Sequence, residues 1–368
     1  MSASLLYHGF GIHGYQYVRT VFEKGTIGSI PVCIELTIQR VECSRCNIVR
    51  QVKLGFANWR RSYTRFFERY VLVLCRHMTP QDVANHLKVG WDTINGILKR
   101  YLLRRFKRPK INHLKRIAID EISIGKGHRC LTVVLDLSSG AVVFVGDGKG
   151  SDALAPFWKQ LKRSKADIKA VAIDMSPAYI AAVLDNLAQA VIVFDRFHVM
   201  KLYNDGLSDL RRHLQREPQG PMQIKVFKGT RWLLLKNPQN LNNEKDEGNR
   251  LQEALKFNEP LASAYYLKED LRQFWNQNSK ADAEKYLAAW IAKARSSKVA
   301  MLMKMANTLA GHKFGLLSYY DHPISTGPLE GTNNKIKTLQ KQAYGFWDME
   351  LFKLRIFSLH ESRYALVG

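Results

Sequence analysis

Three carboxylic acids stand at positions from which they could act together on a phosphate ester. Asp120 and Asp174 each end a short, nearly all-apolar run that is typical of a buried strand. Glu330 heads the segment Glu-Gly-Thr-Asn-Asn-Lys-Ile-Lys over residues 330–337. Phosphodiester transfer uses two divalent ions about 3.5–4 Å apart, and carboxylate oxygens are ligands that Mg²⁺ and Mn²⁺ prefer. The sequence therefore predicts a site for a pair of Mg²⁺ or Mn²⁺ ions.

Each acid taken alone also has a structural explanation. Asp174 precedes Met-Ser-Pro and could cap the helix that follows it. Asp120 and Glu121 could form an ordinary charge pair at the edge of a hairpin. The three acids together favour the catalytic interpretation, because a site for two ions needs several carboxylates from separate elements.

Further polar residues lie close to these acids along the chain. Asp195 ends another apolar run, and His198 follows it, where the imidazole could orient a phosphate or a water, or could fix the corner between strand and helix. Lys337 lies two helical turns after Glu330 on the same face and could clamp the phosphate, with Asn334 as a helper. The alternative for Lys337 is a solvated basic helix face.

The charge of the chain indicates a polyanionic partner. Its 368 residues include 56 Lys and Arg against 32 Asp and Glu, for a formal net charge of +24 at pH 7. This balance favours nucleic acid over small molecules, with a ribosome-associated or generally basic protein as the alternative. The length favours two or three domains.

No segment predicts membrane insertion or secretion. No apolar run reaches the roughly 20 residues that a membrane helix requires, and no secretory leader pattern is present. The five cysteines, an odd number in a long chain, favour reduced thiols. We therefore expect a cytoplasmic protein.

Residues 1–60 predict a small β-rich module that resembles a degenerate zinc finger. Residues 30–40 alternate apolar and polar side chains like a half-buried strand. Cys43 and Cys46 form one Cys-x-x-Cys pair, whereas tetrahedral Zn²⁺ needs four ligands, and the region has no clear second pair. A zinc site and a metal-free knuckle both remain open.

Residues 61–110 predict a helix-turn-helix that binds DNA. Thr79 can cap the first helix with Pro80 at its first position, and Val89 and Gly90 supply the turn. The alternative is an ordinary helical hairpin. The candidate DNA-binding residues lie on the second helix and its basic continuation: Thr93, Asn95, Lys99, Arg100, Arg104 and Arg105.

The remaining chain predicts an α/β core interrupted by helices. Residues 111–204 read as three meandering strands, a helix, a strand, a helix and a strand, which is the order of the RNase H-like fold. Residues 205–322 predict an all-helical insertion. Residues 323–368 return to the core with Glu330, and the helix predicted over 346–357 is expected to pack on the sheet.

Four segments resemble the DDE transposases of bacterial insertion sequences, and the ISL-three family most closely. They are Ile-Asp-Glu-Ile-Ser-Ile-Gly-Lys-Gly-His (119–128), Ala-Ile-Asp-Met-Ser-Pro-Ala-Tyr (172–179), Phe-Asp-Arg-Phe-His (194–198) and Leu-Glu-Gly-Thr-Asn-Asn-Lys-Ile-Lys (329–337). The resemblance runs through nearly the whole chain, and the four motifs together are highly specific.

The resemblance implies roles for the site residues. Asp120, Asp174 and Glu330 would be the metal-binding triad, and the N-terminal region would recognise terminal inverted repeats. Asp195 and His198 are similar to the Asp-x-x-His feature that related transposases carry before a helical insertion.

Two departures from the family pattern stand out. The span from Glu330 to Lys337 is similar to the Glu-x6-Lys part of a transposase signature, but Pro323 and Thr326 replace its Tyr and Arg. Members of the family usually begin with a zinc finger of two cysteine pairs, and here the region has a single pair.

The resemblance implies a DNA transposase of a mobile element, working on the bacterial nucleoid. It would bind terminal inverted repeats and use divalent metal to cleave a DNA strand and transfer it to target DNA. Because two ends must be joined, a homodimer or larger assembly on double-stranded DNA is expected. The alternatives are a catalytically silent repressor derived from a transposase and another RNase H-like nuclease.

Overall fold

The computed structural model describes most of the chain after residue 60 and short parts of it before. The described residues are 20–21, 33–34, 40–42, 46–51, 55–58, 61–107, 109–125, 129–216, 230–256 and 258–359. The chain divides into two compact units, which are Met1–Arg108 with Thr338–Ser358, and Pro109–Lys337 with Leu359–Gly368. Each unit is described by itself.

The N-terminal region contributes two short antiparallel strand pairs. They are β1 (Thr20–Val21) with β2 (Cys33–Ile34), and β3 (Arg40–Glu42) with β4 (Val49–Gln51). Most of the strand predicted over 30–40 lies outside the described residues. Cys43 lies outside them as well, whereas Cys46 is an exposed free thiol. Zinc binding by this pair therefore stays a prediction.

The first unit continues with the helices α2 (Arg65–Leu74), α3 (Pro80–Leu87) and α4 (Trp91–Phe106). The predicted cap of α3 is confirmed, because Thr79 Oγ1 accepts the N–H of Asp82 at 3.2 Å and the Asp82 carboxylate accepts the N–H of Thr79 at 3.3 Å. Lys88 ends α3 in the left-handed region with φ 54°, and Gly90 precedes α4. The two helices form the expected helix-turn-helix pair.

The helix α16 (Met349–Ser358) packs on α4. The rings of Phe106 and Phe357 stack with centroids 6.5 Å apart, and the Arg355 guanidinium donates to the backbone carbonyl of Cys75 at 3.1 Å. Within its own unit the run therefore packs on the helix-turn-helix, and its packing on the sheet stays a prediction. Helical periodicity shows that one face is buried, but it does not identify the element that buries it.

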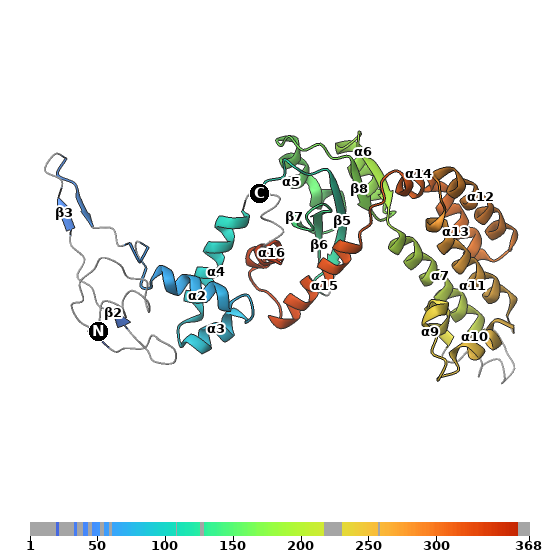
Figure 1. The fold of residues 1–368 in the computed structure, drawn as a ribbon, viewed down its shortest axis with the longest axis horizontal. Coiled ribbons are helices and arrows are strands. Elements are labelled where there is room, and N and C mark those ends of the chain that lie inside the picture. Colours follow the sequence, from blue (N-terminus) through green and yellow to red (C-terminus); the bar gives the residue numbers. More distant parts are fainter. Residues whose placement is uncertain are drawn as a thin grey trace. The chain divides into compact units, whose positions relative to one another are not determined.

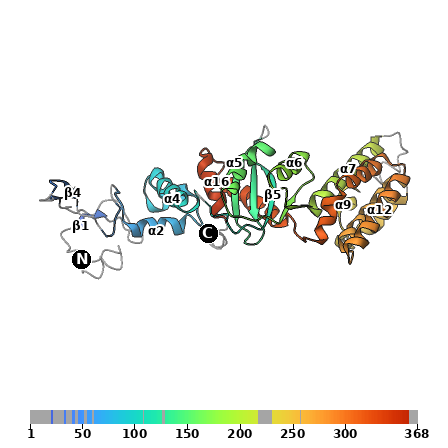
Figure 2. The same ribbon diagram turned by 90° about the horizontal axis from the view of Figure 1, so that it is seen from above.

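The second unit is built on a five-stranded sheet in the order β7-β6-β5-β8-β9 (Figures 1 and 2). Its strands are β5 (Arg116–Ser123), β6 (Cys130–Asp136), β7 (Val142–Asp147), β8 (Ala170–Ile173) and β9 (Val191–Phe194). β6 pairs antiparallel with both β5 and β7. β8 pairs parallel with β5, and β9 pairs parallel with β8. This mixed sheet is consistent with the RNase H-like core predicted from the sequence.

The helices α5 (Ser151–Lys162) and α6 (Pro177–Asn186) connect these strands and pack on them. The approach of α5 to β7 requires glycine at position 146, since a Cβ there would lie 2.3 Å from the backbone oxygen of Ala153. The described strands β6 and β8 are almost wholly buried, which places the core of this unit between sheet and helices.

In the described residues of the insertion after β9, the regular elements are all helices, and these helices group together in Figure 1. They are α7 (Arg196–Arg216), α9 (Thr230–Leu235), η1 (Pro238–Asn240), α10 (Glu247–Lys256), α11 (Glu259–Arg272), η2 (Gln273–Asn276), α12 (Lys280–Ser296), α13 (Ala300–Gly311), α14 (Lys313–Leu317) and η3 (Ser318–Tyr320). A buried tyrosine in α7, Tyr203, donates to the Ala264 carbonyl at 2.8 Å and packs against Trp290. The chain then enters α15 (Gly327–Gln342).

None of the helices in the described part of the chain combines the length and apolar character that a membrane span requires.

Candidate active site

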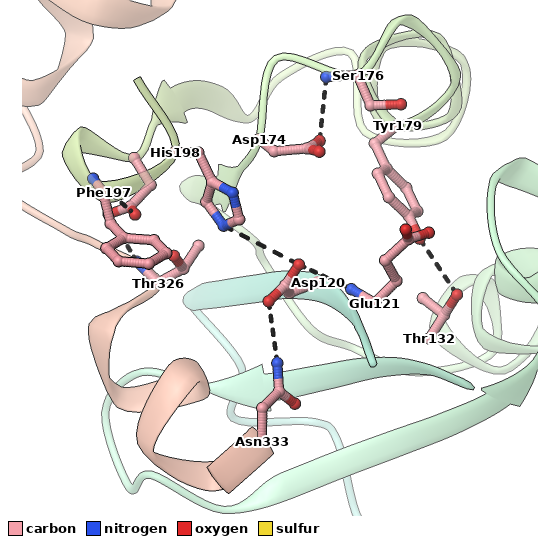
Figure 3. A network of polar contacts seen from close by, with 11 residues as sticks. Asp120, Glu121, Thr132, Asp174, Ser176, Tyr179, Phe197, His198, Thr326 and Asn333 are labelled. Atoms are coloured by element: carbon pink, nitrogen blue, oxygen red, sulfur yellow. Dashed lines mark hydrogen bonds and ion pairs between the residues drawn. The ribbon is translucent and has the colours of Figure 1, made fainter. Parts of the chain in front are cut away.

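Parallel strand pairing brings Asp120 and Asp174 to the same edge of the sheet. β5 and β8 are neighbours, and Ala118 pairs with Ala172 in their register. Asp120 and Asp174 each lie two residues further along, so Asp174, which directly follows β8, reaches the same height as Asp120 on β5. Figure 3 shows Asp120 and Asp174 in the same region, with His198 beside them.

The surroundings of Asp120 disfavour its ionised form. Burial raises the pKa of its carboxyl group above the ordinary value, and the nearby carboxylates of Asp174 and Glu121 raise that pKa further. His198 and a hydrogen bond from the Glu121 N–H to Asp120 Oδ1 at 2.8 Å act in the opposite direction. A carboxylate in such surroundings is stabilised by any cation that comes close to it.

His198 belongs to this acidic edge. It lies in the first turn of α7, and its Nε2 is 4.0 Å from Asp120 Oδ1. Its ring contacts that of Phe197 edge to face, with centroids 5.5 Å apart. The imidazole therefore faces Asp120, and both roles drawn from the sequence, orientation of a phosphate or a water and fixing of the corner between strand and helix, stay predictions.

Asp195 has a different environment, because both of its oxygens accept backbone hydrogen bonds. The side chain is 2% exposed. Its Oδ2 accepts the N–H of Phe197 at 3.0 Å, and its Oδ1 accepts the N–H of Thr326 at 3.1 Å. Asp195 thus joins the end of β9 to the segment that leads into α15. This contact fixes Thr326 just before α15 begins, and Glu330 follows four residues later.

The helix α15 contacts the acidic edge through Asn333. Its Nδ2 donates to Asp120 Oδ2 at 2.9 Å, and the residue is 7% exposed. Glu330 is half-buried in the first turn of the same helix, three residues earlier and so on the same side. Asn333 was not among the site residues predicted from the sequence. Its position at helical spacing between Leu329 and Ile336, which are both buried, was the pattern that could have indicated a buried amide.

Lys337 and Asn334 are both exposed on α15. Lys337 lies two turns beyond Glu330, as the spacing predicts, and the helix is continuous between them. The phosphate clamp assigned to Lys337 stays a prediction.

The donor atoms at this edge fit a hard divalent ion. Asp120 and Asp174 offer carboxylate oxygens, and Asn333 Oδ1 is buried without a hydrogen-bond partner among the described residues. Such oxygens suit Mg²⁺ and Mn²⁺, and a cation would relieve the repulsion between the acids. In the described residues, however, no three His, Cys, Asp or Glu side chains are close enough to form a metal-binding group. Glu330 therefore lies on the adjoining helix without joining the two aspartates.

The candidate DNA-binding residues of α4 fall into two groups. Lys99 forms ion pairs with Asp348 at 2.7 Å and Glu350 at 2.8 Å, and these hydrogen-bonded acids raise its pKa. Arg100 contacts the Tyr63 hydroxyl and ring and lies 3.4 Å from Glu68. The other four residues of the prediction are exposed or half-buried on the same helix: Thr93, Asn95, Arg104 and Arg105.

Asn95 carries an unsatisfied group in this helix. Its Oδ1 is buried without a hydrogen-bond partner among the described residues, although the residue as a whole is half-buried.

Two family models match this chain. Residues 117–356 match the DDE domain of the ISL3 family, described as "Transposase", and residues 52–102 match the "Helix-turn-helix domain of transposase family ISL3". The first match contains Asp120, Asp174 and Glu330, and the second contains the helices α2 and α3 and most of α4.

Individual transposases are similar to this chain over most of their own length. The transposase for insertion sequence element IS1001 of Bordetella parapertussis is 33% identical over 331 residues, covering 88% of this chain and 80% of that protein. The transposase for IS1557 of Mycobacterium tuberculosis is 27% identical over 366 residues, covering 93% of this chain and 82% of that protein. A solved Drosophila P element transposase strand transfer complex has a TM-score of 0.40 at 12% identity, covering 83% of this chain and 94% of that one, which is too distant to support an argument. The chain belongs to the ISL3 family of transposases.

Proposed function

We propose that this transposase binds the terminal inverted repeats of its element and performs metal-dependent DNA cleavage and strand transfer at Asp120, Asp174 and Glu330. The observation that carries the proposal is the pairing of β5 with β8, which brings two half-buried carboxylates to one edge of the sheet. The helix that bears Glu330 contacts the first of these acids through Asn333.

The three acids would hold a pair of Mg²⁺ or Mn²⁺ ions. When bound, such ions activate the attacking oxygen and stabilise the leaving oxygen of a phosphodiester. The residues of the chain supply position and charge. Asp120 and Asp174 are oriented by the sheet, His198 stands where it can hold a phosphate or water beside Asp120, and Lys337 would bind a phosphate further along the strand.

DNA recognition is assigned to the helix-turn-helix. The second helix, α4, would place Thr93 and Asn95 at base edges, while Arg104 and Arg105 would bind phosphates. Lys99 and Arg100 are engaged with acids of their own unit, so we assign them a weaker part in DNA binding.

The proposed function also implies an arrangement of domains and copies. We retain residues 1–60, 61–110, 111–204, 205–322 and 323–368 as functional segments, with the insertion at 205–322 contacting DNA or a second copy. Joining two ends of one element requires a homodimer or larger assembly on DNA. The site of action would be the cytoplasm, on the bacterial nucleoid.

The experiment is a cleavage assay on a labelled duplex that carries the terminal repeat of the element, in Mg²⁺ or Mn²⁺. The wild type should cut at the repeat boundary, and Glu330→Ala should bind the duplex without cutting it. Binding without cutting by the wild type would favour a catalytically silent repressor. Cutting of branched DNA with no preference for the repeat would favour a different nuclease.

A further inference from the structure

A buried amide lies where α15 meets β5. Asn333 is 7% exposed, and its Nδ2 donates to Asp120 Oδ2 at 2.9 Å (Figure 3). Its Oδ1 is buried and has no hydrogen-bond partner among the described residues. The amide therefore makes one strong contact through its nitrogen and leaves its oxygen unsatisfied.

Burial of the unpaired Asn333 oxygen is unfavourable for the packing of α15. The buried face of α15 is otherwise formed largely by apolar side chains, including Leu329, Ile336 and Leu339. A leucine at position 333 would extend that face and would avoid the desolvation of an unpaired amide oxygen. The amide is explained better by its effect on Asp120 than by the stability of the helix contact.

The contacts of Asp120 show what that effect is. Its Oδ1 accepts the backbone N–H of Glu121 at 2.8 Å, and its Oδ2 accepts Asn333 Nδ2. One donor on each oxygen fixes the rotation of the carboxylate about its last bond. Since each carboxylate oxygen has a second lone pair, both can still accept another ligand.

The same hydrogen bond also positions Glu330. Asn333 follows Glu330 by three residues on one side of α15, so the contact with Asp120 brings the side of the helix that bears Glu330 toward β5. At its N-terminal end the helix is held by the hydrogen bond from the Thr326 N–H to Asp195. Two polar contacts, one from β5 and one from Asp195 just after β9, thus hold the part of the chain that bears Glu330.

We propose that Asn333 is a positioning residue of the metal site. Its amide orients the Asp120 carboxylate toward a divalent ion and holds the helix that bears Glu330 against β5. This inference rests on the proposed function, because it requires that these acids bind metal. Groups that orient a metal ligand change metal affinity by about 10–100-fold when they are removed.

The test measures binding of Mn²⁺ to the full chain without DNA, as the rise in the midpoint of thermal unfolding during a titration with MnCl₂. Asn333→Leu keeps the size of the side chain and removes the donor. We expect its apparent affinity for Mn²⁺ to fall by about 10–100-fold. In the cleavage assay the half-saturating Mn²⁺ concentration should rise by the same factor, with most of the rate recovered at saturation.

A matched control is available in α6, in the same unit. Asn186 Nδ2 donates to the Ala182 carbonyl at 2.9 Å, and Asn186→Leu removes an amide donor of the same kind without touching Asp120 or α15. This variant should titrate with Mn²⁺ as the wild type does. If Asn333→Leu does not fold, Asn333→Ser removes the same amide with a smaller polar side chain and is measured in its place.

The outcomes separate this inference from the proposed function. A variant of Asn333 with a lower metal-free midpoint but an unchanged Mn²⁺ titration would overturn the positioning role and leave a structural one. A wild type that neither gains stability from Mn²⁺ nor cleaves the repeat duplex would overturn the proposed metal site itself. A 10–100-fold weaker titration beside an unchanged Asn186→Leu titration supports the inference.

Discussion

At the scale of single residues, the acidic edge places Asp120 where its charged form is disfavoured. Asp120 is surrounded by apolar packing and two other acids, which raise the pKa of its carboxyl group. His198 and the hydrogen bond from the Glu121 N–H favour its charge, and Asn333 donates to its other oxygen. Perturbed carboxylates of this kind are frequent where chemistry occurs, because charge is held there at a cost in stability.

This cost predicts a stabilising but inactivating substitution. The pKa of Asp120 is higher in the folded protein than in the unfolded chain. Between these two pKa values the folded protein holds a proton that the unfolded chain has lost. The free energy of unfolding therefore falls as pH rises from the unfolded pKa through the folded pKa. Asp120→Asn removes this effect. Without metal, the variant should unfold at a higher temperature than the wild type at pH 7, and the difference should vanish below about pH 3. Cleavage should be lost at every pH.

Thermal unfolding in EDTA, monitored by circular dichroism, checks the predicted stability. The cleavage assay checks the predicted loss of activity. If Asp120→Asn were less stable than the wild type at pH 7, the hydrogen bonds and His198 would outweigh the burial and the neighbouring acids.

At the scale of elements, the site depends on how α15 is attached to the sheet. The helix follows a long insertion, so the covalent chain does little to define where it begins. Asp195 provides that attachment by accepting hydrogen bonds from Phe197 and from Thr326, 131 residues further along the chain. Motif similarity pairs Asp195 with His198, but their contacts differ. Asp195 accepts hydrogen bonds from backbone N–H groups, and His198 faces Asp120.

Removing this attachment should disturb α15 more than the sheet. Asp195→Ala leaves two backbone N–H groups without their acceptor in a buried place, and each unsatisfied donor costs about 1–3 kcal/mol. We expect a lower free energy of unfolding, measured with urea, and faster hydrogen exchange at the Thr326 amide. His198→Ala is the contrast: it should reduce cleavage and leave exchange at Thr326 unchanged. Equal exchange in both variants would contradict the attachment role.

At the scale of the whole molecule, a net charge of +24 is the property that most affects its association with DNA. Each phosphate neutralised by a basic residue steepens the decrease of affinity with salt, by a slope of about 0.9 per contact on duplex DNA. The basic residues are not equivalent, however. Lys99 is already paired with Asp348 and Glu350, whereas Arg104 and Arg105 are exposed.

The salt dependence should separate these two kinds of basic residue. Arg104→Ala and Arg105→Ala should each reduce the slope of log affinity against log salt by about 0.9, if each residue binds one phosphate. Lys99→Ala should leave the slope nearly unchanged and alter stability by about 0–1 kcal/mol, as is usual for partly exposed ion pairs. Fluorescence anisotropy with a labelled duplex at several salt concentrations checks this. A larger slope change for Lys99→Ala than for the arginines would contradict it.

The sequence by itself determined the local features of this protein. Apolar runs and turn residues predicted the strands of the core, the capped helix at Thr79 and the helical insertion, because such patterns depend on neighbours a few residues away. Acids at strand ends and the segment that begins with Glu330 indicated the site and the family before any contact was known.

Only the tertiary structure decided which of these features meet. Asn333 and Asp120 are 213 residues apart in the chain, and Lys99 and Asp348 are 249 apart. Periodicity shows that a helix face is buried or exposed, but the partner of that face depends on packing of the whole chain. For this reason the sequence predicted the acids and the helices one by one, but it indicated neither the contact of Asn333 with Asp120 nor the packing of α16 on α4.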